Sequence, residues 1–600
     1  MRAADFLMKA IRDLGVEHVF YVSGGGAMHL NDALGRSDLT GVCMLHEQGA
    51  SIAAESYGRM REGYGVCLVT SGPGGTNALT GLAGAYMESS PVIFLSGQVK
   101  REDLREHAFG GERTDAPPRQ FGIQEVDILS MARPYTKYAV RLDDPKDVRY
   151  EFEKAAAIAM EGRPGPVWLD IPLDVQAAEV AEEELRGFDG EGIPSCPAEP
   201  KGIDQVIERL RQAKRPLLFL GSGIRLAHAA EEARELYECL GIPVQTSWNG
   251  LDLIEDGHPL FFGRPGIVAN RAANIIGQHA DFVLSIGARL GLLNTGYNFR
   301  SFWGNAFHVM VDIDEKELGK KNLHPDLPIR CDAGAFLRAL LARKEELSWK
   351  RSGKWLEHCR EMTEKYPVFL PEQEPGRGYV SNYHLIDEIS RQMTGQDVYQ
   401  FTSSGTTVDI TMKVLRIKKG QRSFLTKGLA AMGYDIPACI GSCIASGRRT
   451  VCLTGDGSAA MNMQELEVIR RLHLPIKLFI SDNQGYAMIY GSQKGNFKGR
   501  LTGCTKESGL TLPDMGKIAG AFGIPSLRIE DEAHIKEQVE KALNMDGPVV
   551  CVARTDITQP ILPKQANYMK EDGQMASRPL DDMTPLLDRE EYEALRKWDK

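Results

Sequence analysis

The sequence predicts an α/β protein built from three doubly wound domains, each organised around a parallel sheet. Near-continuous apolar segments alternate with helical segments over most of the chain, a pattern typical of parallel strands covered by helices on both faces. The length of 600 residues exceeds what a single hydrophobic core serves. Two segments rich in charge, proline and glycine divide the alternation into three stretches.

The three stretches predict the domain limits and their strands. The first domain, residues 1–181, has apolar strands in the segments VEHVFYV, GVCML, GVCLV, PVIFL and GPVWLDI. The second, residues 200–345, has them in RPLLFL, GIPVQTSW, DFVLSI and HVMVDI. The third, residues 375–558, has them in DVYQF, VCLTG, IKLFIS and PVVCVAR.

The segments outside these domains differ from them in composition. Residues 182–202 are acidic, then rich in Pro and Gly, and are expected to form a linker. Residues 347–381 are highly charged and are expected to form a second, weakly ordered linker. The Pro-rich, polar residues 559–600 are expected to form an extended tail on the surface.

Composition narrows the function classes. The net charge is -10 and no basic, aromatic-rich patch stands out, so no nucleic-acid partner is expected. The 11 cysteines are scattered without a CxxC pair, which favours buried, reduced thiols over a structural zinc site. The N-terminal segment does not resemble a signal peptide, and no apolar run is long enough to span a bilayer. A cytoplasmic protein without a membrane partner is expected.

Two strand ends in the third domain carry short, oxygen-bearing side chains. Gly455-Asp456-Gly457 follows the strand VCLT, and Asp482-Asn483 follows the strand IKLFIS one helix later. Because a crossover helix joins parallel strands, these residues are expected to converge beyond one edge of the sheet. Carboxylate and amide oxygens suit Mg²⁺, and a glycine-flanked helix N-terminus suits a phosphate. A metal-bridged diphosphate site is predicted, with an ordinary turn and loop as the alternative.

Two strand-to-helix junctions of the first domain also carry polar residues. His46-Glu47-Gln48 ends the strand GVCML where an Ala-rich helix begins. A carboxylate in the first helical turn is favoured by the helix dipole and stays ionised unless it is desolvated. Simple helix capping is the alternative reading of Glu47. The segment TSGPGGTN, residues 70–77, is a further glycine loop of the same kind.

The segments HEQGA, TSGPGGTN, GLAAMGYDIPACIG and the GDG-to-Asn interval occur in the order seen in thiamine diphosphate enzymes. The chain resembles that family over essentially its whole length, and is most similar to the acetolactate (acetohydroxyacid) synthase-like branch. The resemblance implies pyrimidine-binding, central Rossmann-like and diphosphate-binding domains, with thiamine diphosphate and Mg²⁺ as cofactors. It also implies decarboxylation of a 2-ketoacid such as pyruvate and transfer of the hydroxyethyl unit to a carbonyl acceptor.

The resemblance assigns roles to individual residues. Glu47 is similar to the glutamate that hydrogen-bonds N1′ of the cofactor's aminopyrimidine, and Gln124 of FGIQEVDI is similar to an active-site glutamine, so both are expected to be catalytic. Met432 resembles the bulky residue beneath the bent cofactor. The expected metal ligands are Asp456, the Asn483 side chain and the Gly485 carbonyl. Further cofactor contacts are expected from Pro73, Asn77, Ser404, Gly405, Thr406, Ala430, Gly457, Ser458 and Tyr486.

The same resemblance implies an oligomer. In such enzymes the glutamate matching Glu47 serves a cofactor bound to the third domain of another chain. A homodimer or a homotetramer, with active sites at the dimer interface, is therefore expected. The family usually has Gly where this chain has Ala430, and a methyl group there is tolerable if only the carbonyl is used.

Two departures concern the acceptor. The segment GARLGLL keeps Arg289 but has Gly291, Leu292 and Leu293 where authentic acetohydroxyacid synthases carry an acidic pair and an arginine. Ser492 stands where the biosynthetic enzymes have a tryptophan that selects the acceptor. The smaller side chain leaves room for a larger acceptor. Other segments resemble acetolactate synthase-like proteins of surface-polysaccharide and deoxysugar pathways, for which a keto-sugar nucleotide is the expected acceptor.

Several alternatives stay open at this point. FLGSG and VDID resemble flavin-contacting strand ends but equally fit ordinary Rossmann-like turns, so FAD is an open alternative. The reaction can also be decarboxylation or C–C lysis without ligation. A catalytically silent subunit is a rival of another class, against which the intact Glu47, Asp456 and Asn483 argue. A nicotinamide dehydrogenase is disfavoured because no full GxGxxG with an acidic ribose ligand is present.

Overall fold

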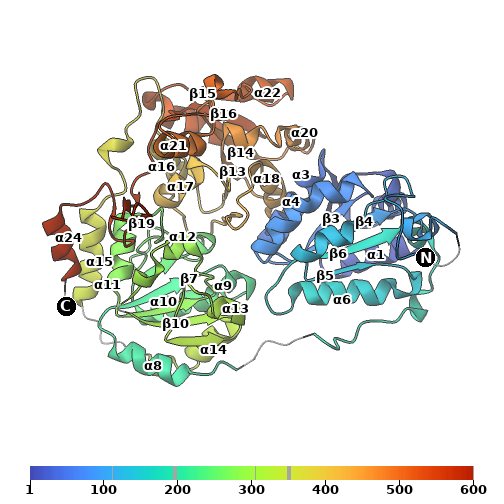
Figure 1. The fold of residues 1–600 in the computed structure, drawn as a ribbon, viewed down its shortest axis with the longest axis horizontal. Coiled ribbons are helices and arrows are strands. Elements are labelled where there is room, and N and C mark those ends of the chain that lie inside the picture. Colours follow the sequence, from blue (N-terminus) through green and yellow to red (C-terminus); the bar gives the residue numbers. More distant parts are fainter. Residues whose placement is uncertain (111–112, 194–198, 305, 348–352, 599–600) are drawn as a thin grey trace.

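A computed structural model describes the chain except for residues 111–112, 194–198, 305, 348–352 and 599–600. Three parallel sheets with helices on both faces form three bodies, coloured blue, green and orange in Figure 1. This confirms the predicted fold class. No helix among the described residues is long and apolar enough to cross a membrane.

The first sheet has six strands in the order β2-β1-β3-β4-β6-β5. Its strands are β1 (His18–Tyr21), β2 (Thr40–Cys43), β3 (Gly65–Val69), β4 (Val92–Gln98), β5 (Tyr138–Arg141) and β6 (Val167–Pro172). The helices are α1 (Ala3–Asp13), α2 (Met28–Arg36), α3 (Glu47–Arg61), α4 (Pro73–Met87), α5 (Ile128–Ala132), α6 (Val148–Met160) and α7 (Leu173–Ala177). The edge strand β5 is an addition to the five predicted strands.

The second sheet has five strands in the order β11-β10-β9-β7-β8. They are β7 (Pro216–Leu220), β8 (Val244–Thr246), β9 (Phe282–Ile286), β10 (Phe307–Asp312) and β11 (Leu327–Arg330). The helices are α8 (Ile203–Gln212), α9 (Gly223–Leu226), α10 (Ala230–Leu240), α11 (Arg271–His279), α12 (Leu292–Thr295), α13 (Glu315–Leu318) and α14 (Ala333–Leu341).

The third sheet has the order β12-β13-β14-β16-β15. Its strands are β12 (Val398–Phe401), β13 (Thr450–Gly455), β14 (Ile476–Asp482), β15 (Ser526–Ile529) and β16 (Val549–Arg554). The helices are α16 (Asn382–Gln392), α17 (Thr406–Val414), α18 (Asp435–Ser446), α19 (Asp456–Ala459), α20 (Leu466–Arg471), α21 (Ala487–Asn496), α22 (Met515–Ala521) and α23 (Ile535–Asn544).

The prediction of a weakly ordered linker is wrong for residues 353–365. Residues Gly353–Lys365 form the helix α15, which packs on the second sheet's core through Trp355, Cys359 and Met362. Trp355 Nε1 also donates a hydrogen bond to the Pro216 carbonyl at 2.9 Å. The apolar residues recur at helical spacing, so one face is buried although the composition is highly charged.

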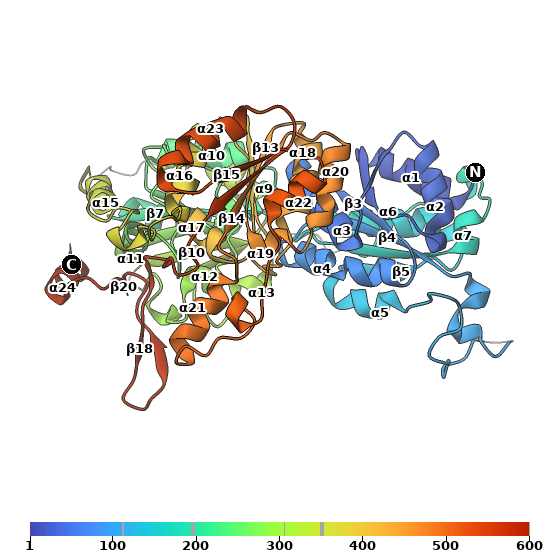
Figure 2. The same cartoon turned by 90° about the horizontal axis from the view of Figure 1, so that it is seen from above.

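The tail is only partly the extended surface segment that the sequence predicts. It contains the short strands β17 (Lys564–Gln565), β18 (Asn567–Met569), β19 (Met575–Ser577) and β20 (Met583–Thr584), and the helix α24 (Arg589–Arg596). Figure 2 shows the β18 hairpin projecting from the molecule. The remainder is anchored: Met583 is fully buried, and the Trp598 ring stacks on His358 of α15 at 3.4 Å between centroids. A few large apolar side chains therefore dock an otherwise polar segment.

The first and third sheets share one hydrophobic core. Helices α3 and α4 of the first domain and α18 of the third lie between the two sheets (Figure 1), and their inward residues form a single cluster. The approach is close at Gly441 of α18, where an added Cβ would lie 2.1 Å from the Ala53 carbonyl oxygen of α3. Only glycine permits this contact, so the two domains are held in fixed relation.

Candidate active site

The paired strands β13 and β14 bring the two polar strand ends together. They are parallel neighbours, and Gly455 lies opposite Ser481. The next residue of each chain segment, Asp456 and Asp482, therefore lies at the same edge of the sheet, at the end of one of two adjacent strands. A pocket with about 570 Å³ of empty space, open to solvent, lies beyond this edge. Its lining comprises Ser404, Gly405, Thr406, Thr407, Met432, Gly455, Asp456, Gly457, Ser458, Asn483, Gly485, Tyr486, Ala487, Met488 and Ile489.

Two oxygen acceptors in this pocket have no hydrogen-bond partner among the described residues. Asp456 Oδ2 and Asn483 Oδ1 are both buried and unsatisfied, although Asp456 Oδ1 accepts a bond from Gly457 N at 2.8 Å. Burial, reinforced by the nearby Asp482 carboxylate, raises the pKa of Asp456 to about 8. Unpaired acceptors of this kind are costly in a protein interior, and a divalent cation with oxygen ligands satisfies both. The donor set therefore fits Mg²⁺.

The loop before α18 borders the same pocket and carries Ala430 and Met432. Ala430 adopts φ 57°, a left-handed conformation that glycine accepts without steric cost, which gives a physical reason for the family's preference there. Gly433 N donates to Ser458 Oγ at 2.8 Å, and that hydroxyl donates to the buried Asp435 at 2.5 Å. The Ser458 side chain thus fastens the loop to α19, which leaves only its backbone for a diphosphate.

Asp435 and Asn462 belong to this support and were not singled out from the sequence. Burial raises the pKa of Asp435, and its carboxylate accepts bonds from Ser458 and Thr454. Asn462 Nδ2 donates to the Gly433 carbonyl at 2.6 Å. A buried Asp within the apolar segment GYDIPACIG was the available signal, since a carboxylate among apolar neighbours needs partners.

A second group of predicted residues comes together in the first domain. Glu47 is the first residue of α3, and Asn77 of α4 donates Nδ2–H to Glu47 Oε2 at 3.0 Å. Pro73 begins α4 after Gly72. The Gln124 carbonyl is packed so closely on Gly72 that a Cβ there would lie 2.7 Å away. Glu47, Asn77, Pro73 and Gln124 therefore surround the N-termini of two adjacent helices.

The loop that carries Gln124 is fixed by side chains that the sequence did not single out. Gln124 has φ 64°, an unusual value for a residue with a side chain. The buried Glu125 accepts bonds from the backbone N–H groups of Arg105, Phe121 and Gly122 at 2.6 to 3.1 Å. Gln98 at the end of β4 donates to the Val126 carbonyl at 3.0 Å. These bonds hold an otherwise strained turn in one conformation.

One chain does not close the two groups into a single pocket. All of the described residues that line the Asp456 pocket belong to the third domain. In the same chain, the third domain meets the α3 N-terminus through Glu465, whose carboxylate accepts a hydrogen bond from His46 N at 3.0 Å. We refer to these two separate groups of candidate residues as the Asp456 half-site and the Glu47 half-site.

Comparison with known proteins decides the family. Models of the thiamine pyrophosphate enzyme N-terminal TPP binding domain, central domain and C-terminal TPP binding domain match residues 1–117, 203–340 and 403–553. The chain is 33% identical to a probable acetolactate synthase large subunit of Methanococcus aeolicus over 91% of both chains. The chain belongs to the thiamine pyrophosphate enzyme family. The family prediction from the sequence motifs is confirmed.

Other relatives place this thiamine pyrophosphate enzyme in the acetolactate synthase type. It is 30% identical to the acetolactate synthase isozyme 2 large subunit of Escherichia coli (strain K12), over 94% of this chain and 97% of that one. It is also 30% identical to acetolactate synthase 1, chloroplastic, of Zea mays, over 94% and 87% of the two chains. The Glu47, Gln124 and metal-ligand assignments stay predictions at this point.

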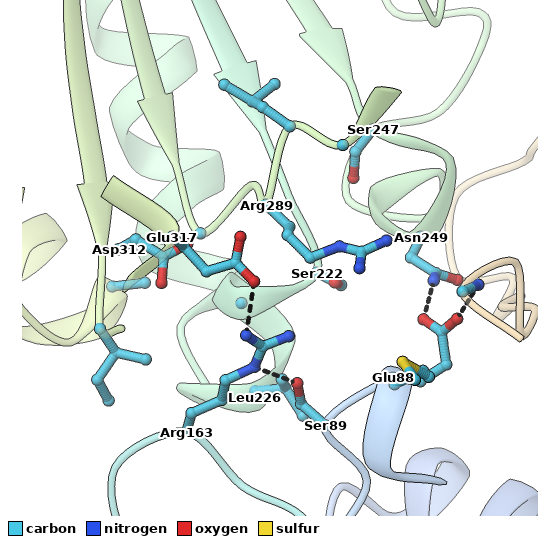
Figure 3. A pocket seen from close by; sticks show the side chains of 18 of the residues that line it. Glu88, Ser89, Arg163, Ser222, Leu226, Ser247, Asn249, Arg289, Asp312 and Glu317 are labelled. Carbon is cyan, nitrogen blue, oxygen red and sulfur yellow. Dashed lines mark hydrogen bonds and ion pairs between the residues drawn. The ribbon is translucent and has the colours of Figure 1, made fainter. Parts of the chain in front are cut away.

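A larger cavity lies where all three domains meet (Figure 3), with about 1180 Å³ of empty space open to solvent. The strand ends singled out for flavin contribute Ser222, Gly223, Asp312 and Ile313, and Arg289 and the departing Gly291, Leu292 and Leu293 also line it. Burial raises the pKa of Asp312 to about 6.

Side chains from the first domain close two edges of this cavity. Arg163 donates hydrogen bonds to Glu317 at 2.7 Å and to Ser89. Glu88 accepts hydrogen bonds from Asn249 and from Gly428 N, each at 2.6 Å. Figure 3 shows Arg163, Glu317 and Ser89 together at one edge of the cavity, and Glu88 with Asn249 at another. A molecule bound here would contact the first, second and third domains at once.

Proposed function

We propose that this enzyme uses thiamine diphosphate and Mg²⁺ to decarboxylate a 2-ketoacid, pyruvate in the first instance, and to transfer the resulting two-carbon unit to a carbonyl acceptor. The observation that carries the proposal is the pair of unsatisfied oxygens, Asp456 Oδ2 and Asn483 Oδ1, at adjoining strand ends in a pocket also lined by Met432. The acetolactate synthases among its relatives support the reaction class.

The third-domain pocket supplies the residues that would hold the cofactor. Asp456, the Asn483 side chain and the Gly485 carbonyl are the proposed metal ligands, a set that suits the octahedral oxygen coordination of Mg²⁺. Backbone groups of Gly457, Ser458 and Tyr486, and of Ser404, Gly405 and Thr406 across the pocket, are proposed to meet the diphosphate. When bound there, thiamine diphosphate would supply the nucleophilic carbon that the reaction requires.

The Glu47 half-site supplies the group that sets the protonation state of the pyrimidine ring. Asn77 orients one carboxylate oxygen of Glu47, which leaves the other oxygen free to form a hydrogen bond with N1′ of the ring and so to favour the tautomer that carries a proton on N1′. The Ala430 carbonyl and the Met432 N–H are proposed to hold the opposite edge of the ring. Gln124, fixed in a strained turn, is proposed to position the reacting carbonyl group.

We infer that a homodimer is the smallest active assembly, because the two half-sites of one chain do not line a common pocket. Large apolar side chains stand exposed beside both halves, including Leu45 and Ile123 next to Glu47 and Gln124, and Met488 and Ile489 in the pocket wall. Ile123 is 89% exposed, and the proposed dimer interface would bury it. A tetramer would combine two such dimers.

The acceptor is proposed to be larger than a simple ketoacid. Ser492 lies exposed on α21, next to the pocket residues Met488 and Ile489. A short side chain there leaves space at the pocket mouth, and a keto-sugar nucleotide is the acceptor class that we propose to test first. Flavin is assigned to the three-domain cavity as a second candidate cofactor, supported by the position of Asp312 and Arg289 on its lining.

Carbon dioxide release from pyruvate by purified protein, with thiamine diphosphate and Mg²⁺ added, tests the proposal. Glu47→Gln should abolish it, and Glu17→Gln, which removes only an exposed carboxylate paired with Arg61, should not. Full activity of Glu47→Gln would remove Glu47 from the mechanism. Cofactor binding without turnover on any of a broad ketoacid panel would indicate a silent subunit.

Product analysis with and without an added aldehyde or ketone separates ligation from decarboxylation or C–C lysis. A new C–C bond in the presence of an acceptor supports ligation, whereas free aldehyde as the only product under both conditions supports decarboxylation alone. The visible absorbance of the purified protein decides the flavin assignment, since bound flavin absorbs there and thiamine diphosphate does not.

A further inference from the structure

The buried carboxylate of Glu465 joins the two half-sites within one chain. Glu465 lies in the crossover between β13 and β14, whose carboxyl ends carry the proposed metal ligands. Its side chain is 0% exposed and reaches from the third domain to the start of α3. There it accepts hydrogen bonds from Leu45 N at 3.2 Å and from His46 N at 3.0 Å.

The fit around this carboxylate is tight. A Cβ added at Gly49, in the first turn of α3, would lie only 2.4 Å from Glu465 Oε1. His46 is the N-cap residue, and its Nδ1 accepts a bond from Gln48 N at 3.0 Å. Glu47 lies between His46 and Gly49, so residues on both sides of it in this turn contact the Glu465 carboxylate.

A second contact from the same crossover holds the same segment. The Arg471 guanidinium at the end of α20 donates a hydrogen bond to the Cys43 carbonyl. The backbone of residues 43–46 is therefore held by hydrogen bonds at one carbonyl, that of Cys43, and at two N–H groups, those of Leu45 and His46. A buried carboxylate is retained only where such bonds offset its desolvation, and the positive end of a helix dipole adds to them.

We propose that Glu465 is a positioning residue that fixes Glu47 for its work on the partner's cofactor. The inference rests on the proposed function, in which Glu47 serves the neighbouring site of the dimer. Glu465 belongs to the element that joins Asp456 to Asn483, so it connects a chain's own metal site to the glutamate that the chain lends to its partner. A change in one active site then has a direct mechanical route to the other.

The test compares Glu465→Gln with Glu467→Gln in the full-length protein. Glutamine replaces one acceptor oxygen with an NH₂ group, so at least one amide bond to residues 45–46 is lost without a change in size. Glu467 lies two residues further on and forms an ion pair with Arg470 at the surface, which makes it a matched control. Glu467→Gln is expected to behave as wild type in every measurement.

Three kinds of measurement report the effect of Glu465→Gln. Hydrogen exchange of backbone amides in peptides covering residues 43–50 is expected to accelerate at least tenfold in the protein without added cofactor. The rate of C2-proton exchange of bound thiamine diphosphate, followed by NMR, is expected to fall at least tenfold. The dissociation constants of thiamine diphosphate and Mg²⁺, from titration of tryptophan fluorescence, and the KM for the ketoacid are expected to change by less than a factor of two.

Faster amide exchange with unchanged C2-proton exchange would overturn the positioning role. Weakened cofactor binding would also overturn it, because the contact would then serve the fold of the chain's own pocket. Gly49→Ala provides an independent variant that pushes the carboxylate away from α3 and should reproduce the slower C2-proton exchange. Its control is Gly63→Ala, whose nearest neighbouring atom lies 3.9 Å from the added Cβ.

The outcome for Glu47→Gln separates this inference from the proposed function. If Glu47→Gln keeps the wild-type rate of C2-proton exchange, the assigned role of Glu47 fails whatever Glu465 does. If Glu47→Gln slows the exchange and neither Glu465→Gln nor Gly49→Ala does, the proposed function stands and the positioning role of Glu465 is refuted.

Discussion

The buried carboxyl group of Asp170 predicts how the stability of the first domain depends on pH. Asp170 lies on β6 and is 2% exposed. Ser96 Oγ and Gln98 Nε2 donate to its two oxygens at 2.6 and 3.0 Å. Burial nevertheless dominates and raises its pKa from 3.8 to about 7. Between these values the folded protein binds a proton that the unfolded chain has released.

The pKa shift of Asp170 determines the sign and the size of its contribution to the free energy of unfolding. The contribution to stability is complete below pH 3.8 and is lost as the pH rises through about 7. At 1.36 kcal/mol per pKa unit, the difference amounts to about 4 kcal/mol. Asp170→Asn removes the ionisation. About two of the three pKa units lie above pH 5, so from pH 5 to pH 8 the variant should gain about 3 kcal/mol relative to wild type. For a domain of this size the relative gain corresponds to roughly 8 °C in Tm.

Differential scanning calorimetry across that pH range measures the effect directly. The quantity of interest is the Tm difference between Asp170→Asn and wild type, because a constant cost of replacing the carboxylate then cancels. Asp174→Asn is the control: partial burial raises the pKa of Asp174, but hydrogen bonds from Arg101 outweigh it and lower the pKa below its usual range. Its ionisation therefore falls outside pH 5–8. A pH-independent Tm difference for Asp170→Asn would refute the reasoning.

Three further predictions concern the contacts that build the half-sites. Gly441→Ala places a Cβ 2.1 Å from the Ala53 carbonyl oxygen and should destabilise the protein by about 2 kcal/mol or more; an unchanged Tm in calorimetry would contradict this. Ala430→Gly relieves a φ of 57° and should leave the Tm unchanged or raise it, against the loss of about 1 kcal/mol usual for this exchange in a helix; a clear fall in Tm would argue against strain there. Asp456→Asn removes the charged oxygen donor and should weaken Mg²⁺ binding in isothermal titration calorimetry more than tenfold, and equal affinities would exclude Asp456 as a ligand.

The fold was largely predictable because buried parallel strands have a strong local signal. Segments such as PVIFL and DFVLSI are apolar without interruption, and each forms a buried strand, β4 and β9. β5 and β11 lie at sheet edges, are less buried, and lack that signal. α15 was missed because its charged face dominates the composition, although Trp355, Cys359 and Met362 keep helical spacing.

Only part of the candidate site could be predicted from the sequence. Asp456, Asn483 and Glu47 stand out because polar residues directly follow strands. Glu465 gave no comparable signal: a glutamate in a charged helical segment normally faces solvent, and its burial depends on α3 approaching from another domain. Residues whose role depends on such tertiary contacts are invisible to local patterns.

The separation of the two half-sites on one chain has a consequence for mixtures of variants. In the proposed dimer, a Glu47→Gln chain would be damaged only in the half-site that it lends to its partner, and an Asp456→Asn chain only in the half-site that it keeps. If the two inactive proteins exchange subunits, each mixed dimer should contain one doubly damaged site and one site built entirely from intact half-sites. Random exchange should therefore restore about a quarter of the wild-type sites. Two inactive proteins would regain activity simply by being combined.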